Sequence, residues 1–290
     1  MNIVRKHCIP TACISVLLST VMGNAVGKEV TIPFDPVNFP VVPGPINNQY
    51  WPLTPIGASF SYQAKTEDEC EFNKLIVTAE TYYIAAVDVT TTVVRDQEWV
   101  TEVDDDGECD TSTAELTEDT RDYYAQDISG NIWYFGEDTW SWDDETEQCT
   151  DDGAWEAGAP IGDPEVDPAQ AGIVMLANPE SGDRYRQELL EDEAEDWGAV
   201  LRLNATASTD LGEFSDCLIT KEWTPIEPGE IEHKYYCLTP APGGIGFGLV
   251  LIEELKGKTK TVELTDNFPA GLPGDNDANF PADALGCNGD

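Results

Sequence analysis

The chain has 290 residues, and its 56 Asp and Glu residues against 15 Lys and Arg residues give a formal net charge of −41. Binding to nucleic acids requires a basic surface, so this charge excludes ordinary nucleic-acid binding and also argues against binding to anionic membranes. The chain is 41% apolar and has eight tryptophans, enough to fill a hydrophobic core. The acidity therefore indicates either a salt-rich habitat or cation binding rather than global disorder.

Residues 1–25 are typical of an export signal. Arg5 and Lys6 supply a positive start, Cys8–Met22 an apolar stretch, and Ala25 a small residue for cleavage. The apolar stretch is shorter than the roughly 20 residues that span a bilayer. We expect a signal peptide, a secreted or periplasmic location, and no integral membrane segment once the signal is removed.

Composition divides the rest of the chain into three parts. Residues 26–57 form a Pro-rich extended lead-in, residues 58–264 an antiparallel β domain, and residues 265–290 a tail rich in Gly, Pro and Asp.

Short stretches of alternating or β-branched residues run through the β domain. Leu75–Ala79 and Ala85–Val103 are examples, with a turn expected near Thr81–Ile84. Only Leu189–Trp197 favours a short helix. Short connections imply antiparallel neighbours. The sequence thus predicts an all-β protein, an antiparallel up-and-down meander that forms a curved sheet, a half-barrel or a sandwich and is stapled by disulfides.

An even number of cysteines lies outside the signal, which in an exported chain favours disulfides over zinc. They are Cys70, Cys109, Cys149, Cys217, Cys237 and Cys287. If Trp223 faces Ile231 across the turn at 224–230, Cys217 lies directly opposite Cys237, close enough for a disulfide.

Three of these cysteines lie in acidic loops. Alternate connections of a meander fall at the same end of the sheet, so the loops of Cys70, Cys109 and Cys149 should meet there. Our preferred bridge is Cys109–Cys149, because their hairpins are consecutive. Cys70 would then bond to Cys287 in the tail.

The Cys109 loop is the strongest candidate for a metal site. Closely spaced carboxylates around a glycine, here Gly107, are typical of calcium loops. The alternative is a solvated acidic tip. The candidate ligands are Glu102, Asp104, Asp106, Glu108 and Asp110.

The hairpin register also places Lys221, His233 and Tyr235 on one face. Such a set would suit proton abstraction next to a carboxylate, as in polysaccharide lyases. The alternative is a histidine that is satisfied within the sheet. The abundance of acids makes any carboxylate pair for glycoside hydrolysis unspecific.

Five segments carry a resemblance to a known group of proteins. They are Tyr50–Gly57, Asp122–Asp127, Gly130–Glu137, Glu232–Tyr236 and Gly246–Val250. Together they resemble a family of uncharacterised secreted bacterial β-proteins, and the last two resemble curved antiparallel half-barrels of the lipoprotein-carrier type. The resemblance implies a concave sheet that holds an apolar ligand or a partner segment, and it implies no catalytic residues.

These observations favour an exported binding or assembly module that is not an enzyme, with calcium as the candidate cofactor. The expected partner is a small apolar ligand, a polysaccharide or another protein. A secreted polysaccharide lyase or glycoside hydrolase is the alternative, and an extracellular filament subunit is a further one.

Overall fold

A computed structural model describes residues 27–104, 106–143, 148–151, 153–159, 167–238, 247–255 and 260–268. The proposed signal, Cys287 and most of the tail lie outside these residues. The elements are η1 Pro36–Asn38, β1 Ile46–Asn47, β2 Pro52–Leu53, β3 Ser59–Lys65, β4 Glu69–Ile84, β5 Val89–Glu102, η2 Thr111–Thr113, β6 Glu115–Gln126, β7 Ile132–Asp143, β8 Gln148–Thr150, β9 Trp155–Glu156, β10 Gln170–Met175, β11 Arg184–Arg186, β12 Glu188–Leu189, β13 Trp197–Thr209, β14 Gly212–Trp223, β15 Glu232–Cys237, β16 Gly248–Glu254 and β17 Lys260–Phe268.

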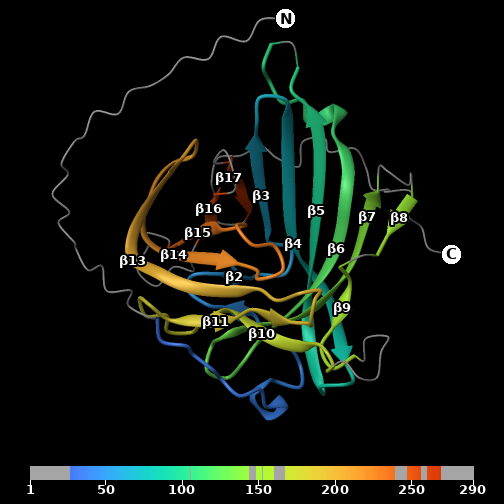
Figure 1. Ribbon diagram of the computed structural model, residues 1–290, viewed down its shortest axis with the longest axis vertical. Coiled ribbons are helices and arrows are strands. Elements are labelled where there is room, and N and C mark those ends of the chain that lie inside the picture. The colour runs from blue at the N-terminus through green and yellow to red at the C-terminus, as the bar shows by residue number, and fades with distance from the viewer. Residues whose placement is uncertain are drawn as a thin grey trace, which may run out of the picture.

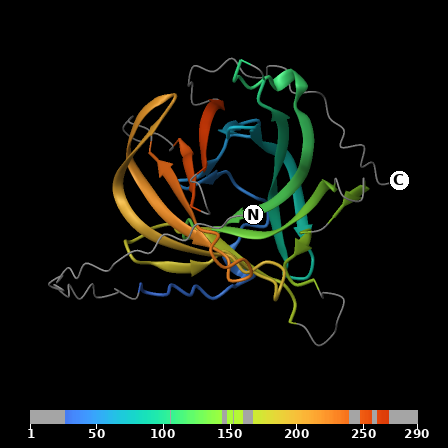
Figure 2. The ribbon, with the colours of Figure 1, turned by 45° about the horizontal axis from the view of Figure 1, so that its top comes forward.

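One antiparallel sheet contains every strand except β1 and β2, which pair with each other. Its order is β11-β13-β14-β15-β16-β17-β3-β4-β5-β6-β7-β10-β12, and β8 and β9 also pair with β7. Figures 1 and 2 show that this sheet curls around into a nearly closed barrel. The predicted all-β antiparallel meander is confirmed, and the curvature goes further than a half-barrel.

The barrel closes where β10 lies in contact with β11. Gly172 of β10 makes this approach possible, because a β-carbon there would lie 2.3 Å from the carbonyl of Gln187. The other side of β11 is covered as well. Val30 donates a backbone hydrogen bond of 2.8 Å to the carbonyl of Arg184. The lead-in thus shields an edge strand that would otherwise expose unpaired backbone groups.

The Pro-rich lead-in also covers one end of the barrel. The ring of Phe39 packs edge-on against Trp133 and Phe135 on the outer face of β7, with centroid distances of 5.9 and 5.4 Å. Further along, the buried amide of Asn48 donates a hydrogen bond of 3.1 Å to the carbonyl of Leu176. The segment between Phe39 and Asn48 thus leads the residues that follow Asn48 into the opening of the barrel (Figure 1).

The position expected for the turn, near Thr81–Ile84, is wrong, because the turn lies directly after these residues. β4 continues to Ile84, which pairs with Val89 at the start of β5. The reversal falls at 85–88, where Asp88 takes a positive φ of 55°. Asp tolerates this conformation better than the Thr and Tyr residues of the expected turn, which fit a strand.

No helix forms at Leu189–Trp197, so that expectation is wrong as well. Leu190 and Ala194 exchange backbone hydrogen bonds of 2.7 and 2.9 Å around a tight turn. Asp192 in that turn has a φ of 65°. The short segment between β12 and β13 therefore reverses direction, and helix propensity does not decide its conformation.

The disulfide Cys217–Cys237 is confirmed. The two residues are direct partners in the register of β14 and β15, with a Cα–Cα distance of 4.0 Å. The expected register of this hairpin, which pairs Lys221 with His233, is therefore also present.

The preferred bridge between Cys109 and Cys149 is wrong, because Cys109 bonds to Cys70 with a Cα–Cα distance of 5.9 Å. Cys70 lies near the start of β4 and pairs with Thr101 of β5, shortly before the loop that carries Cys109. Cys149 lies on β8, where it pairs with Trp142 of β7. Cys149 is disulfide-bonded to a partner outside the described residues, and because Cys70 is already bonded to Cys109, the expected Cys70–Cys287 bridge is also wrong.

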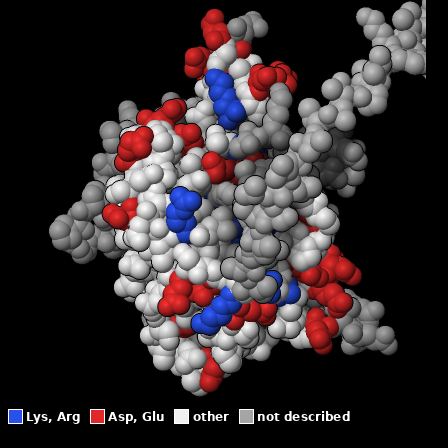
Figure 3. All heavy atoms as spheres, turned by 60° about the vertical axis from the view of Figure 1, so that its left-hand side comes forward, with Lys and Arg blue, Asp and Glu red and all other residues white. Residues whose placement is uncertain are grey.

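The Cys70 and Cys109 loops meet at one end of the barrel, the upper end in Figure 1, where a disulfide joins them. The Cys149 loop lies partly outside the described residues, so its expected place beside them stays a prediction. On the face shown in Figure 3, Asp and Glu side chains gather at the tip of this upper end and along the lower edge. Lys and Arg side chains are few on the same face. The two disulfides between described residues are of a kind that persists in oxidising compartments, which indicates an exported protein. Among the described residues, no helix is long and apolar enough to cross a membrane.

Candidate functional site

A cavity of about 530 Å³ lies inside the barrel, a size typical of small-ligand sites. Trp51, which the lead-in places there, lies between two tyrosines of the barrel wall. Its ring contacts Tyr124 of β6 at 5.2 Å and Tyr236 of β15 at 6.2 Å between centroids. Tyr124 in turn stacks on Tyr134 of β7 at 5.0 Å. Aromatic rings thus form much of the apolar surface of the cavity.

Strand register decides which polar side chains face this cavity. Leu75, Asp96, Thr120 and Thr139 are successive cross-strand partners on β4, β5, β6 and β7. Because side chains alternate between faces, residues two positions away lie on the same face. The inward face therefore also carries Asn73, Glu98, Glu118, Asp122 and Glu137.

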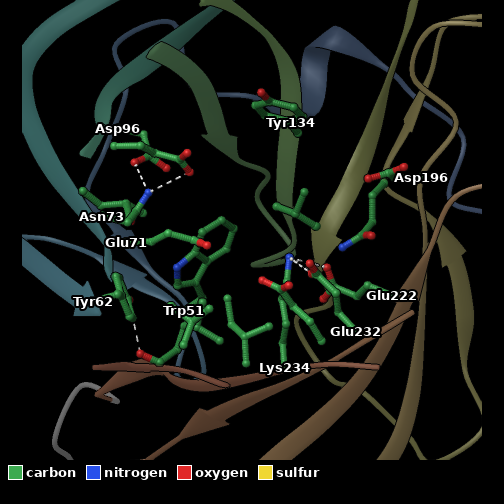
Figure 4. Close-up of a pocket in the computed structure, with 18 of the residues that line it drawn as sticks. Trp51, Tyr62, Glu71, Asn73, Asp96, Tyr134, Asp196, Glu222, Glu232 and Lys234 are labelled. Atoms are coloured by element: carbon green, nitrogen blue, oxygen red, sulfur yellow. Dashed lines mark hydrogen bonds and ion pairs between the residues drawn. The ribbon is translucent and has the colours of Figure 1, made fainter. Parts of the chain in front are cut away.

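On one side of the cavity, the carboxylates form ion pairs with lysines. Lys234 of β15 forms ion pairs with Glu222 at 3.0 Å and with Glu232 at 3.2 Å (Figure 4). Burial alone would lower the pKa of Lys234, but the charges of the two glutamates outweigh it and raise that pKa well above its usual value. The lysine side chain keeps 24% of its surface exposed, because it faces the water-accessible cavity.

Lys260 of β17 forms ion pairs with a second pair of acids. Its ammonium group lies 2.6 Å from Glu71 and 3.1 Å from Glu254. Glu71 and Glu254 both line the cavity. Each lysine on this side is thus shared by two glutamates.

The other side, which we call the acidic wall, consists of the lining residues Asp96, Glu98 and Glu137 together with Asp122, which is hydrogen-bonded to the lining residue Tyr134. Within the described residues, none of the four forms an ion pair with Lys or Arg. Asn73 donates hydrogen bonds to Asp96 at 2.6 Å and to Glu98 at 3.4 Å (Figure 4). Neutral donors therefore hold these carboxyl groups without neutralising them.

Burial perturbs the acidic wall strongly. It raises the pKa of Asp122 to about 8, and the neighbouring Glu137 charge adds to this shift. Burial also raises the pKa of Glu98 and of Glu137 to about 7. For Asp96, burial and the charge of Asp122 raise the pKa well above the ordinary value. Acids with such shifts inside a cavity are typical of functional sites.

Two further acids lie where the barrel closes. Glu188 of β12 and Asp196, just before β13, also line the cavity. Burial raises the pKa of Glu188 to about 8, and the Asp196 charge contributes. Burial likewise raises the pKa of Asp196. The excess of negative charge thus extends from the acidic wall to the closure of the barrel.

Two buried polar side chains of the cavity have no partner within the described chain. The hydroxyl of Tyr124 and the side-chain amide of Gln187 make no hydrogen bond with any described residue, although the residues are only 8% and 7% exposed. Both residues line the cavity, where water or a ligand can satisfy such groups. Both groups are therefore available to a bound molecule.

The residues predicted for a lyase lie together but not in this cavity. His233 and Tyr235 alternate along β15 with the cavity residues Lys234 and Tyr236, so they lie on the outer face. There the Tyr235 hydroxyl donates a hydrogen bond of 2.8 Å to Glu253. Lys221 lies over the ring of Trp223, 4.9 Å from its centroid.

The loop predicted to bind calcium uses part of its carboxylates to hold its own backbone. Asp104 accepts hydrogen bonds from the amides of Asp106 at 3.0 Å and Glu108 at 2.7 Å. Asp110 accepts from the amide of Ser112 at 2.9 Å and caps η2. Glu102 ends β5. In the described part of the chain, no three His, Cys, Asp or Glu residues are placed to hold a metal, and calcium binding stays a prediction.

No family model matches the sequence, and a search of curated proteins finds no match either. A search of solved structures finds a match to a putative lipoprotein from Parabacteroides distasonis ATCC 8503. The sequences are 10% identical over 76% of this chain and 98% of that chain, with a TM-score of 0.30. A TM-score this low does not establish a common fold, so the function has to be argued from the cavity.

Proposed function

We propose that this exported β-barrel is a binding protein that takes one small amphipathic molecule into its internal cavity. The observation that carries the proposal is a cavity of about 530 Å³ in which aromatic rings and unpartnered polar groups of the described chain occur side by side. Such a combination of apolar surface and a few polar groups is typical of small-molecule sites. Free energy is gained when an apolar molecule covers the aromatic rings and removes them from water, whereas a cavity that held water alone would give no such gain.

The test is the binding of a neutral fluorescent probe, N-phenyl-1-naphthylamine, to the full chain. We expect a rise in probe fluorescence that saturates at one probe per protein. Val174 lines the cavity, so Val174→Trp should fill part of it and abolish the rise. Val41 is 90% exposed, so Val41→Trp is the matched control and should bind like the natural chain. Equal binding by both variants would place the probe outside the cavity and refute the proposal.

A second candidate is glycoside hydrolysis, which needs two carboxyl groups in different protonation states. One observation favours it. The Tyr134 hydroxyl lies 2.9 Å from Asp122 and 2.9 Å from Glu137, and both acids have raised pKa values. Release of nitrophenol from nitrophenyl glycosides by the natural chain, together with its loss in Glu137→Gln, would favour this candidate over a binding protein.

A further inference from the structure

The charges of the cavity are out of balance. Among the described residues, nine Asp and Glu residues line it against one lysine, Lys234. Lys234 and Lys260 together account for four of the nine, namely Glu71, Glu222, Glu232 and Glu254. The remaining acids have no ion pair with a Lys or Arg of the described chain. They are Asp96, Glu98, Glu137, Glu188 and Asp196.

The arrangement of these acids does not suit a metal ion. Residues two positions apart on a strand are separated by roughly 7 Å, and neighbouring strands by about 4.8 Å. Asp96 and Glu98 of β5 and Glu137 of β7 therefore form a spread-out array. Among the described residues, no three such groups are placed to coordinate one ion. A compact ion could contact only part of this array, whereas a larger molecule could lie along it.

The uncharged surface of the cavity suits an organic cation. The faces of Trp and Tyr rings attract ammonium groups, and Trp51, Tyr124 and Tyr236 present such rings. Tyr124 and Gln187 line the cavity, their hydroxyl and amide make no hydrogen bond within the described chain, and each group has an oxygen that accepts hydrogen bonds. Carboxylates, aromatic faces and neutral acceptors are thus present together on the walls of one cavity.

We propose that the ligand of this cavity is an organic ammonium compound, with its charged group against the acidic wall and its apolar part on Trp51, Tyr124 and Tyr236. This inference rests on the proposed function and adds the chemical class of the ligand. An anion would meet uncompensated carboxylates, and a neutral molecule of the same shape would leave them without a counter-charge.

The experiment compares three probes that differ in charge but share an octyl chain. Octyltrimethylammonium, 1-octanol and octanoate are titrated into the full chain by calorimetry at about 0.15 M salt, where exposed charges are screened beyond roughly 8 Å. A pH of about 8.5 favours ionised carboxyl groups. We expect one octyltrimethylammonium per chain, bound about tenfold more tightly than 1-octanol, and no binding of octanoate.

Two matched variants separate the cavity from the acidic surface. Glu137→Gln should weaken octyltrimethylammonium about tenfold and leave 1-octanol unchanged. Glu69→Gln changes an exposed glutamate of β4 and should alter neither. Glu98→Gln repeats the test on β5 if the first variant does not fold.

The possible failures are distinct. If 1-octanol binds as tightly as octyltrimethylammonium, and Glu137→Gln changes neither, the ligand class is wrong but the proposed function stands. If none of the three probes binds but N-phenyl-1-naphthylamine does, only the ligand class is wrong; if that probe also fails to bind, both proposals are wrong. If octyltrimethylammonium binds at many sites and Val174→Trp has no effect, the probe reports surface charge and the ligand class is refuted.

Discussion

At the residue scale, the Tyr134 hydroxyl is the most constrained group of the cavity. It has one proton to donate, yet it lies 2.9 Å from a carboxyl oxygen of Asp122 and 2.9 Å from one of Glu137. Two ionised carboxylates cannot both accept that single proton. Asp122 is only 6% exposed, and burial raises its pKa to about 8. Near neutral pH the pair is therefore best satisfied when one carboxyl group keeps a proton.

This protonation makes stability depend on pH. An unfolded aspartate has a pKa near 4, whereas that of folded Asp122 is about 8. Between these values the folded state binds more protons, so the free energy of unfolding falls as the pH rises. Asp122→Asn removes this group and should flatten the decline by at most about 1.4 kcal/mol per pH unit.

The measurement is urea unfolding of the natural chain and the variant at three pH values spaced between about 5.5 and about 7.5, inside the window that the two pKa values set. Asp68→Asn, at an exposed position in the turn before β4, is the control and should keep the natural slope. Parallel curves for all three proteins would contradict a raised pKa at Asp122.

At the element scale, closure of the barrel depends on a close approach of two backbones. The contact between β10 and the residues after β11 leaves no space for a side chain at Gly172. Gly172→Ala should therefore force the two segments apart and destabilise the fold by about 1–3 kcal/mol. Chemical unfolding measures this change. Gly44→Ala is the matched control, because a β-carbon there meets nothing within 4 Å. If Gly172→Ala loses no more stability than that control, the two backbones can move apart without cost, and the prediction is wrong.

The loop after β5 allows a test of the calcium prediction. Asp104 and Asp110 already accept backbone hydrogen bonds, which leaves Asp106 and Glu108 as the freer carboxylates. An ion that binds only the folded state raises the melting temperature. We expect a higher melting temperature in calcium than in chelator, and a smaller difference in the double variant Asp106→Asn, Glu108→Gln. The same melting temperature in both buffers would refute calcium binding.

At the scale of the whole molecule, the sequence predicted the strands better than their neighbours in space. The Cys217–Cys237 bridge could be predicted, because a single tight hairpin determines its register. The Cys70–Cys109 bridge was missed, because it depends on how the loop after β5 folds back towards β4. That approach involves the backbone amide of Val103, which donates to the carbonyl of Asp68 at 3.0 Å. Nothing in the local pattern of residues indicates such a contact.

The acidic lining of the cavity could not be predicted from the sequence for a related reason. On β6, Glu118 and Asp122 face inward, whereas Asp119 and Arg121 face outward and form ion pairs there. Both faces of the strand are polar, so alternation of apolar and polar residues does not identify the inner one. A charged side chain that faces into a barrel is also unexpected, because burial of charge is costly.

The sequence by itself determined the all-β class, the antiparallel order of neighbouring strands, the Cys217–Cys237 bridge and the acidic end of the barrel. These features depend on local periodicity and on short connections. Only the tertiary structure decided that the sheet closes, that the lead-in brings Trp51 inside, and that unneutralised acids face the cavity. Each of these depends on contacts between segments far apart in the chain, where register and close packing outweigh local preference.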